Sequence, residues 1–200
     1  MKNKNGSQLK LGITGGIGSG KTSVCRVFNI LGIPVFSADP VAREIMDNDP
    51  GVKRQINIIT DRDMYLNGDL DRPELAQLIF NDISLLGRVN SLVHPVVFDY
   101  FKKWASEQEA PYIIMEAAIL FESGASKLVD KTVSVIAPVE ERVARVIRRN
   151  RLTRDQVLDR IKNQMDDEER IRLSDYVIYN SENDMIIPAV LKIHNDLMVV

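Results

Sequence analysis

The chain has 200 residues, a length that suits one α/β domain with small inserted subdomains and argues against further domains. A formal net charge of −2 argues against a protein whose main partner is nucleic acid, and the single cysteine, Cys25, excludes a disulfide within the chain. The apolar runs are too short to span a bilayer and the start MKNKNGSQ is polar, so we expect a cytoplasmic protein without a membrane partner, a monomer or weak homo-oligomer.

The first predicted strand, residues 9–14 (LKLGIT), leads into GGIGSGKT at 15–22, which satisfies the phosphate-loop pattern G-x-x-x-x-G-K-[ST]. A helical pattern follows at 22–31, so the loop is predicted to lie at a helix N-terminus, where free N–H groups attract an anion. Lys21 adds charge near the β- and γ-phosphates, and the Thr22 hydroxyl can ligate Mg²⁺. The residues expected to bind ATP in this loop are Gly16, Ile17, Gly18, Ser19, Gly20, Lys21 and Thr22.

Short β-rich runs alternate with helical patterns along the chain. This alternation predicts an α/β protein with a five-stranded parallel sheet, helices on both faces, and ligands at the carboxyl ends of the strands. The predicted strands are residues 9–14, 34–36, 112–115, 132–136 and 176–179, and they lie in the core segments 9–38, 110–137 and 170–200.

Two stretches interrupt this alternation and are predicted to be insertions in a single domain. Residues 39–109 are too many for one crossover helix, and their apolar patterns favour an all-helical insertion that covers an acceptor substrate. Residues 138–169 are charged and rich in arginine, which favours a flexible helical pair acting as a lid. Here Arg145 and Arg149 lie four residues apart, hence on one helical face, and we expect them to neutralise charge during phosphoryl transfer. The alternative is a solvated face paired with nearby acids.

Two carboxylates are expected at strand ends. Asp39 follows the second predicted strand and is placed to orient or deprotonate an acceptor hydroxyl; the alternative, compatible with it, is that Asp39 caps the next helix before Pro40. Glu116 ends the third predicted strand inside an apolar run, where an unpaired buried charge is costly. We expect it to face Mg²⁺, a bound water or a substrate hydroxyl, and the alternative is a buried pair with an arginine.

The combined pattern resembles the dephospho-coenzyme A kinases over nearly the whole chain. Five stretches carry the resemblance in order: LGITGGIGSGKTSV, ADPVARE after the second strand, LVHP before a helix at Val96, ILFESGASKLVDKTVSV, and RIKNQMDDEERIRLSDYVIYN. The resemblance implies a three-layer phosphate-loop kinase fold with a helical acceptor-binding insertion and a helical lid. It also implies transfer of the ATP γ-phosphoryl group to the ribose 3′-hydroxyl of dephospho-coenzyme A, the last step of coenzyme A synthesis.

The resemblance also assigns roles on the acceptor side of the site. Asp39 matches the family's acidic residue proposed as base for the 3′-hydroxyl, and with Thr22 it is expected near Mg²⁺. Arg43 follows Asp39 with the usual spacing, and His94 matches the histidine of a His-Pro pair. Together with Glu116, Arg43 and His94 are expected to bind the acceptor.

On the ATP side, the resemblance matches Arg149 to a lid arginine and Asn180 to the asparagine after the last strand, near the expected adenine site. Arg145 is expected to bind ATP as well. The chain departs from the family pattern at Ser37, where the family usually has aspartate, and at Ala118, where it usually has proline. The retained Asp39 argues that the first carboxylate is not essential.

Two alternatives to this function remain open from the sequence. One is a phosphate-loop kinase for another nucleotide or nucleoside, because the acceptor pocket cannot be placed from sequence. The other is a nucleotide-binding switch without catalysis. The chain has no N-K-x-D guanine signature, which argues against this second alternative.

Overall fold

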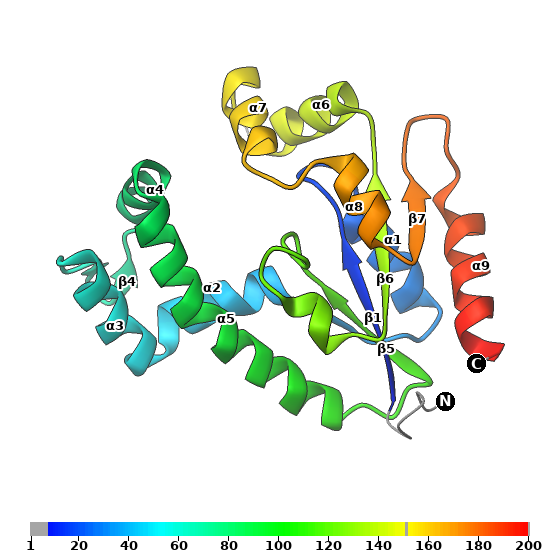
Figure 1. The fold of residues 1–200 in the computed structure, drawn as a ribbon, viewed down its shortest axis with the longest axis horizontal. Coiled ribbons are helices and arrows are strands. Elements are labelled where there is room, and N and C mark those ends of the chain that lie inside the picture. Colours follow the sequence, from blue (N-terminus) through cyan, green and yellow to red (C-terminus); the bar gives the residue numbers. More distant parts are fainter. Residues whose placement is uncertain (1–7, 151, 200) are drawn as a thin grey trace. The chain divides into compact units, whose positions relative to one another are not determined.

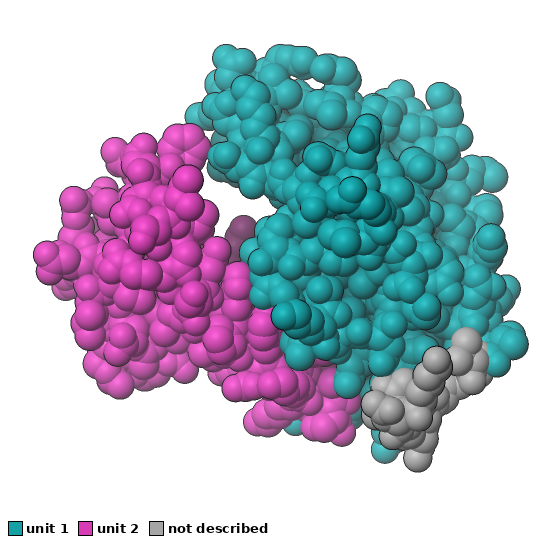
Figure 2. Space-filling view, in the orientation of Figure 1, with its two compact units in different colours: residues 1–37, 107–200 teal, residues 38–106 magenta. Residues whose placement is uncertain are grey.

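The structure is a computed structural model that describes residues 8–150 and 152–199. They form two compact units, which Figure 2 distinguishes by colour: unit 1 lies within residues 1–37 and 107–200, and unit 2 is Ala38–Ser106. The chain therefore leaves unit 1 once, after Ser37, and returns to it at Glu107. None of the helices in the described ranges combines the length and apolar character that a bilayer crossing requires.

Unit 1 is built on five parallel strands: β1 (Leu9–Thr14), β2 (Val35–Ser37), β5 (Tyr112–Glu116), β6 (Lys131–Ile136) and β7 (Tyr176–Tyr179). Their order across the sheet is β2-β5-β1-β6-β7. Figure 1 labels β5, β1, β6 and β7 of this sheet. The predicted five-stranded parallel sheet is thus confirmed. Because β1 pairs with both β5 and β6, the loop that follows β1 lies between the carboxyl ends of its two neighbours.

The helices of unit 1 are α1 (Lys21–Ile30), α6 (Val139–Asn150), α7 (Arg154–Lys162), α8 (Asp167–Leu173) and α9 (Ile186–Val199), with a short 3₁₀ helix at Ala125–Leu128. α1 and α9 contact each other and cover one face of the sheet. Alternate residues of the strands point to this face and bury their side chains against Phe28 of α1 and Ile193 of α9.

The opposite face of the sheet carries α8. Ser134 of β6 hydrogen-bonds through Oγ to Ser174 Oγ at 2.6 Å and donates to the Arg170 carbonyl at 3.3 Å. The sheet therefore lies between two helical layers, and the predicted three-layer α/β class is confirmed.

The helices of unit 2 are α2 (Ala38–Asn48), α3 (Pro50–Thr60), α4 (Arg72–Asn81) and α5 (Ile83–Ser106). α5 packs against each of the other three. Its buried side chains recur every four residues and form one apolar stripe: Leu85, Val89, Val93, Val97, Phe101 and Ala105. This stripe supplies the core of the unit.

Unit 2 also contains a β-hairpin, so the prediction of an all-helical insertion is wrong. The strands β3 (Tyr65–Leu66) and β4 (Asp69–Leu70) pair antiparallel around Asn67 and Gly68, whose φ angles are 53° and 93°. Positive φ at both central residues is typical of a type I′ turn, for which Asn-Gly is a preferred dipeptide. The turn signal was in the sequence, but strands this short show no alternating apolar pattern.

The second correction in unit 2 concerns α5. We predicted a helix beginning at Val96, after the His-Pro pair, whereas α5 is continuous from Ile83 to Ser106 and includes Pro95. Proline in a helix interior removes one backbone hydrogen bond. The buried stripe continues across this point through Val93 and Val97, so tertiary packing holds the helix together where local propensity predicts an end.

The hairpin turn gives a testable stability difference. We expect Gly68→Ala to lower the free energy of unfolding by about 1 kcal/mol, because alanine at a φ of 93° is strained although the space around it is open. Gly87→Ala is the matched control: its space is also open, it lies in α5, and alanine there should raise stability by up to about 1 kcal/mol. Urea unfolding followed by circular dichroism measures both, and changes of the same sign would contradict the assignment.

Candidate active site

The loop between β1 and α1 forms a tight turn at the carboxyl end of the central strand. Ser19 N donates to the Gly16 carbonyl at 3.1 Å, and the Lys21 ammonium donates to the Gly15 carbonyl at 2.8 Å. Gly20 then enters α1 with a φ of 96°. The predicted ATP-binding residues of this segment thus form one continuous loop and first helical turn.

The N-terminus of α1 differs from the starts of four other helices. In α3, α4, α7 and α8 a side chain accepts a hydrogen bond from a first-turn N–H; these side chains are Asp49, Asp71, Thr153 and Asp166. At α1, within the described residues, the residue before the helix is Gly20, and no side chain makes this bond. The Ser19 hydroxyl, in a residue 1% exposed, has no hydrogen-bond partner in the described part of the chain. Free helix N–H groups and a buried unpartnered hydroxyl fit a phosphate ligand.

The structure brings Arg145 and Asn180 to this loop from two other elements. Asn180, directly after β7, donates from Nδ2 to the Ser19 carbonyl at 2.7 Å. Arg145 of α6 donates to the Asn180 carbonyl at 2.8 Å and pairs with Glu141 at 2.8 Å. Arg145 therefore pairs with a nearby acid, as the alternative of a solvated helix face predicts. It also lies beside the phosphate loop.

A cavity of about 510 Å³ opens at the carboxyl ends of β6 and β7. Its walls include Ile136, Pro138 and Tyr179, with Ser181 and Asp184 as polar groups. Tyr179 and Ser181 are the chain neighbours of Asn180, so the cavity adjoins the Asn180 contact with the loop. Mostly apolar walls with a few polar groups suit a flat heteroaromatic ring.

Glu116 ends β5 in register with Ile13 of β1 and Ser37 of β2. Its side chain is half-buried, and its Oε2 accepts a hydrogen bond from Ser37 Oγ at 3.0 Å. Within the part of the chain that the structure describes, the hydrogen-bond partner of Glu116 is thus the Ser37 hydroxyl, and not an arginine as in the alternative of a buried ion pair. An aspartate at position 37 would place a like charge directly opposite Glu116, whereas serine donates to it.

The pKa of the buried Cys25 thiol in α1 responds to the charges near the first turn of this helix. Burial and the negative charge of Glu116 raise the pKa of this thiol, and the positive charge of Lys21 opposes the shift. Lys21 and Glu116 thus both lie close enough to act on the same buried atom. A thiol with a raised pKa stays protonated, so Cys25 serves as a core residue and not as a nucleophile.

The residues near the loop include hard oxygen donors of the kind that Mg²⁺ prefers. Thr22 is the exposed second residue of α1, and Glu116 provides a carboxylate. Residues 8–150 and 152–199 contain no group of three or more His, Cys, Asp or Glu side chains arranged to hold a metal. In kinase sites Mg²⁺ takes one or two protein carboxylates and completes its shell with phosphate oxygens and water, so the donors present fit it.

Three predicted site residues belong to unit 2. Asp39 and Arg43 are exposed and lie four residues apart on α2; the helix already begins at Ala38, so Asp39 is not the residue that caps it. His94 is half-buried in α5 and stacks on Phe98, with ring centroids 6.2 Å apart. Burial lowers the pKa of His94, so the ring is neutral at pH 7.

Arg149 lies on the exposed part of α6, one turn beyond Arg145, and donates from Nε to Asn150 Oδ1 at 2.7 Å. Arg154 pairs with Glu140 at 2.6 Å and fits the solvated-face alternative. The two predicted lid arginines therefore differ: Arg145 borders the phosphate loop, and Arg149 contacts its neighbour in the chain.

The sequence did not predict that Arg142 and Gln164 contact the phosphate loop. Arg142 is 3% exposed and donates from Nε to the Ile17 carbonyl at 2.9 Å, while Gln164 Oε1 accepts from Ile17 N at 2.8 Å. A signal for Arg142 existed, because it lies three residues after Val139 and four before Val146, on the apolar face of α6. Nothing local in the sequence indicated Gln164.

Comparison with known proteins gives a consistent result. The family model described as Dephospho-CoA kinase matches residues 9–185. A dephospho-CoA kinase of Bacteroides fragilis (strain YCH46) is 37% identical over 186 residues, which are 92% of this chain and 91% of that protein. A dephospho-CoA kinase of Porphyromonas gingivalis is 36% identical over 186 residues, 92% of each chain.

Solved structures agree with this similarity. A Thermus thermophilus protein superposes with a TM-score of 0.85 at 33% identity, covering 94% of this chain and 97% of that one. A dephospho-CoA kinase from Campylobacter jejuni gives a TM-score of 0.68 at 22% identity, covering 95% and 97%. A shikimate kinase from Acinetobacter baumannii gives 0.53 at 14% identity, covering 96% and 94%. The last two likenesses concern the fold alone.

Proposed function

The chain belongs to the dephospho-CoA kinase family, and we propose that it transfers the γ-phosphoryl group of ATP to the ribose 3′-hydroxyl of dephospho-coenzyme A, giving coenzyme A and ADP. The observation that carries this proposal is a phosphate loop with an uncapped helix N-terminus in a chain that matches the family model over residues 9–185. The relatives are named dephospho-CoA kinases, which supports the choice of acceptor.

On the ATP side, we propose that the loop N–H groups and Lys21 hold the triphosphate. The cavity beside Asn180 would take the adenine, a role that its apolar walls and Tyr179 support. Arg145 and Asn180 would hold the loop in place, in line with their hydrogen bonds to each other and to Ser19. The open N–H groups at the start of α1 would then face the β- and γ-phosphates.

On the acceptor side, we propose that Asp39 orients the 3′-hydroxyl and takes its proton as that oxygen attacks the γ-phosphorus and the bond to the β-phosphate oxygen breaks. Arg43, His94 and Glu116 would bind the acceptor. Arg149 would neutralise the charge on the transferring group when ATP and the acceptor are bound. These assignments rest on the family pattern and on the residue types.

Mg²⁺, when bound with ATP, supplies charge neutralisation between the phosphates. Thr22 and Asp39 are the side chains that we propose to hold it, with hard oxygen atoms that suit this ion. The protein would act in the cytoplasm, where ATP is available to it.

We expect Glu116→Gln to raise the KM for dephospho-coenzyme A about tenfold, because an amide keeps the shape of the side chain but accepts a weaker hydrogen bond from an acceptor hydroxyl than a carboxylate does. The Kd for ATP should stay within about twofold of the parent value. Steady-state kinetics at saturating ATP measure the first quantity and calorimetry the second. If the Mg²⁺ requirement rises and the acceptor KM does not, Glu116 belongs to the metal side and the assignment fails.

The function itself is tested with γ-labelled ATP and purified protein. We expect label in the 3′-phosphate of coenzyme A, identified by mass spectrometry, and much slower transfer to nucleoside monophosphates or shikimate. Faster transfer to one of these alternatives would contradict the acceptor. ATP hydrolysis that no acceptor changes would favour a nucleotide-binding switch.

A further inference from the structure

Both backbone polar groups of one phosphate-loop residue, Ile17, are held by side chains from residues 138–169. The Ile17 carbonyl accepts from Arg142 Nε at 2.9 Å, and Ile17 N donates to Gln164 Oε1 at 2.8 Å. Arg142 lies on α6, whereas Gln164 lies in the connector between α7 and α8. The loop is thus held by side chains that lie outside it. They bind the backbone of Ile17 and leave the N–H groups at the start of α1 available to a ligand.

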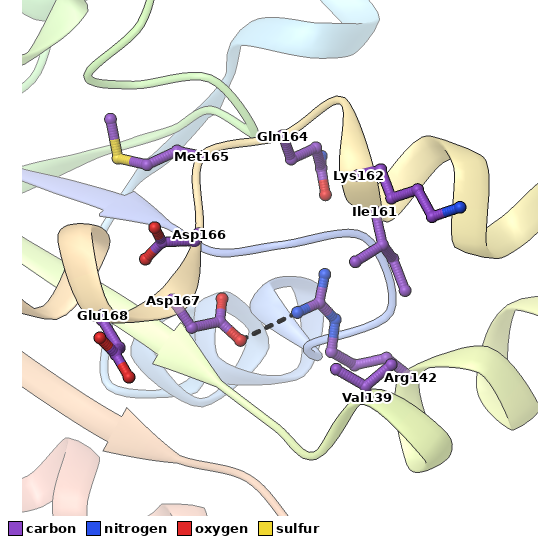
Figure 3. A pocket seen from close by; sticks show the side chains of 9 residues that line it. All are labelled: Val139, Arg142, Ile161, Lys162, Gln164, Met165, Asp166, Asp167 and Glu168. Atoms are coloured by element: carbon purple, nitrogen blue, oxygen red, sulfur yellow. Dashed lines mark hydrogen bonds and ion pairs between the residues drawn. The ribbon is translucent and has the colours of Figure 1, made fainter.

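The two contacts are joined by a buried ionic network. Asp167 Oδ2 accepts from Arg142 at 2.9 Å, and Asp167 Oδ1 accepts from Arg170 at 2.6 Å (Figure 3 shows the Arg142 pair). Arg170 is fully buried and donates to the Met165 carbonyl at 2.9 Å, in the same connector that carries Gln164. The network therefore orders both the arginine and the connector that supplies the glutamine.

Arg142 also lies closely against the loop. A Cβ on Gly16 would collide with the Arg142 guanidinium, which is held by its bonds to Ile17 and Asp167 and cannot easily move away. Two arginines share one carboxylate in this network, so about one positive charge is left over next to a loop that binds phosphate. Figure 3 shows Arg142, Gln164 and Asp167 around a cavity of about 520 Å³.

We propose that Arg142 is a positioning residue for ATP, which with Gln164 holds the backbone on both sides of Ile17 so that the phosphate loop is already shaped before the nucleotide binds. A loop ordered in advance loses less conformational freedom on binding, and this difference appears as affinity. The inference rests on the proposed function only in taking ATP as the ligand. Its effect is on nucleotide affinity, while acceptor binding should be unaffected.

The test is ATP affinity in a matched pair of variants. We expect Arg142→Met, which keeps the length and apolar part of the side chain, to raise the Kd for ATP by about 10- to 100-fold. The KM for dephospho-coenzyme A should change by less than about twofold. Arg148→Met is the control, because Arg148 is exposed on the same helix, and it should leave both quantities unchanged. Calorimetry with ATP and Mg²⁺ measures Kd, and urea unfolding checks that each variant is folded.

A double-mutant cycle separates positioning from general stability. Gln164→Leu alone should also weaken ATP binding, and it leaves the buried ion pairs in place, so it tests the proposal even if Arg142→Met does not fold. Because both side chains hold the backbone of the same residue, Ile17, the loss of ATP affinity in the double variant should be smaller than the product of the two single losses. When Arg148→Met is combined with Gln164→Leu, the effects of the two changes on the Kd for ATP should simply multiply.

Two results would overturn the proposal: ATP affinity within about twofold of the parent in Arg142→Met or Gln164→Leu, or multiplicative losses in their combination. A failure of the proposed function looks different. In that case the parent protein binds ATP but does not phosphorylate dephospho-coenzyme A, and the effects of these variants on ATP affinity are still measurable.

Discussion

Lys21→Ala is expected to reduce kcat/KM for the phosphorylation of dephospho-coenzyme A by about 10²- to 10³-fold. The ammonium is held beside the loop by the Gly15 carbonyl at 2.8 Å, and in phosphate loops this lysine stabilises charge that develops on the β- and γ-phosphates. An alanine leaves that charge without its partner inside the site. Coupled assays for ADP release, run with and without acceptor, measure the loss.

The control for this prediction is Lys192→Ala, an exposed lysine of α9, which should retain full activity. Lys21→Ala should remain folded, because the change removes one hydrogen bond of about 1 kcal/mol from the loop. A folded Lys21→Ala variant with more than about a third of the parent activity would remove Lys21 from the mechanism.

Asp39→Asn is expected to lower kcat by about 10²- to 10⁴-fold, the range for loss of a general base, while the Kd for ATP stays within about twofold. An amide has nearly the same shape as the carboxylate but cannot accept the proton of the 3′-hydroxyl. Asp39 is exposed, so its replacement should cost little stability. Single-turnover experiments with labelled ATP separate the chemical step from product release.

Glu44→Gln is the matched control for Asp39→Asn, since it makes the same kind of change at an exposed position of the same helix. Its kinetics should equal those of the parent protein. If Asp39→Asn weakens Mg²⁺ binding but the chemical step at saturating Mg²⁺ keeps the rate of the parent protein, Asp39 acts only as a metal ligand and not as the base.

The strands and the phosphate loop could be predicted because their signals are local. A buried strand appears as an apolar run, an amphipathic helix repeats with a period near 3.6, and the loop needs its residue types at fixed spacing. The two fold errors arose where local signals were weak or misleading. The strands β3 and β4 are each two residues long, and Pro95 indicates a helix boundary that the packing of α5 overrides.

The candidate site was predicted in part, and the missing part depends on contacts between distant segments. Ser37 was identified from the sequence only as a departure from the family pattern, yet in the sheet it donates to Glu116, 79 residues later. Arg142 was not among the residues predicted for the site, and it lies 125 residues along the chain from the Ile17 carbonyl that it contacts. Such pairs leave no periodic trace in either segment.

By itself the sequence determined the α/β class, the order of the strands along the chain and a loop that binds polyphosphate, because each follows from neighbouring residues and their spacing. Only the tertiary structure decided the order of strands across the sheet, the partner of Glu116, and which side chains hold the loop from outside. These depend on how strands 43 to 120 residues apart are paired. They also depend on the cost of burying charges such as Arg142 and Arg170, which is offset only when Asp167 lies between them.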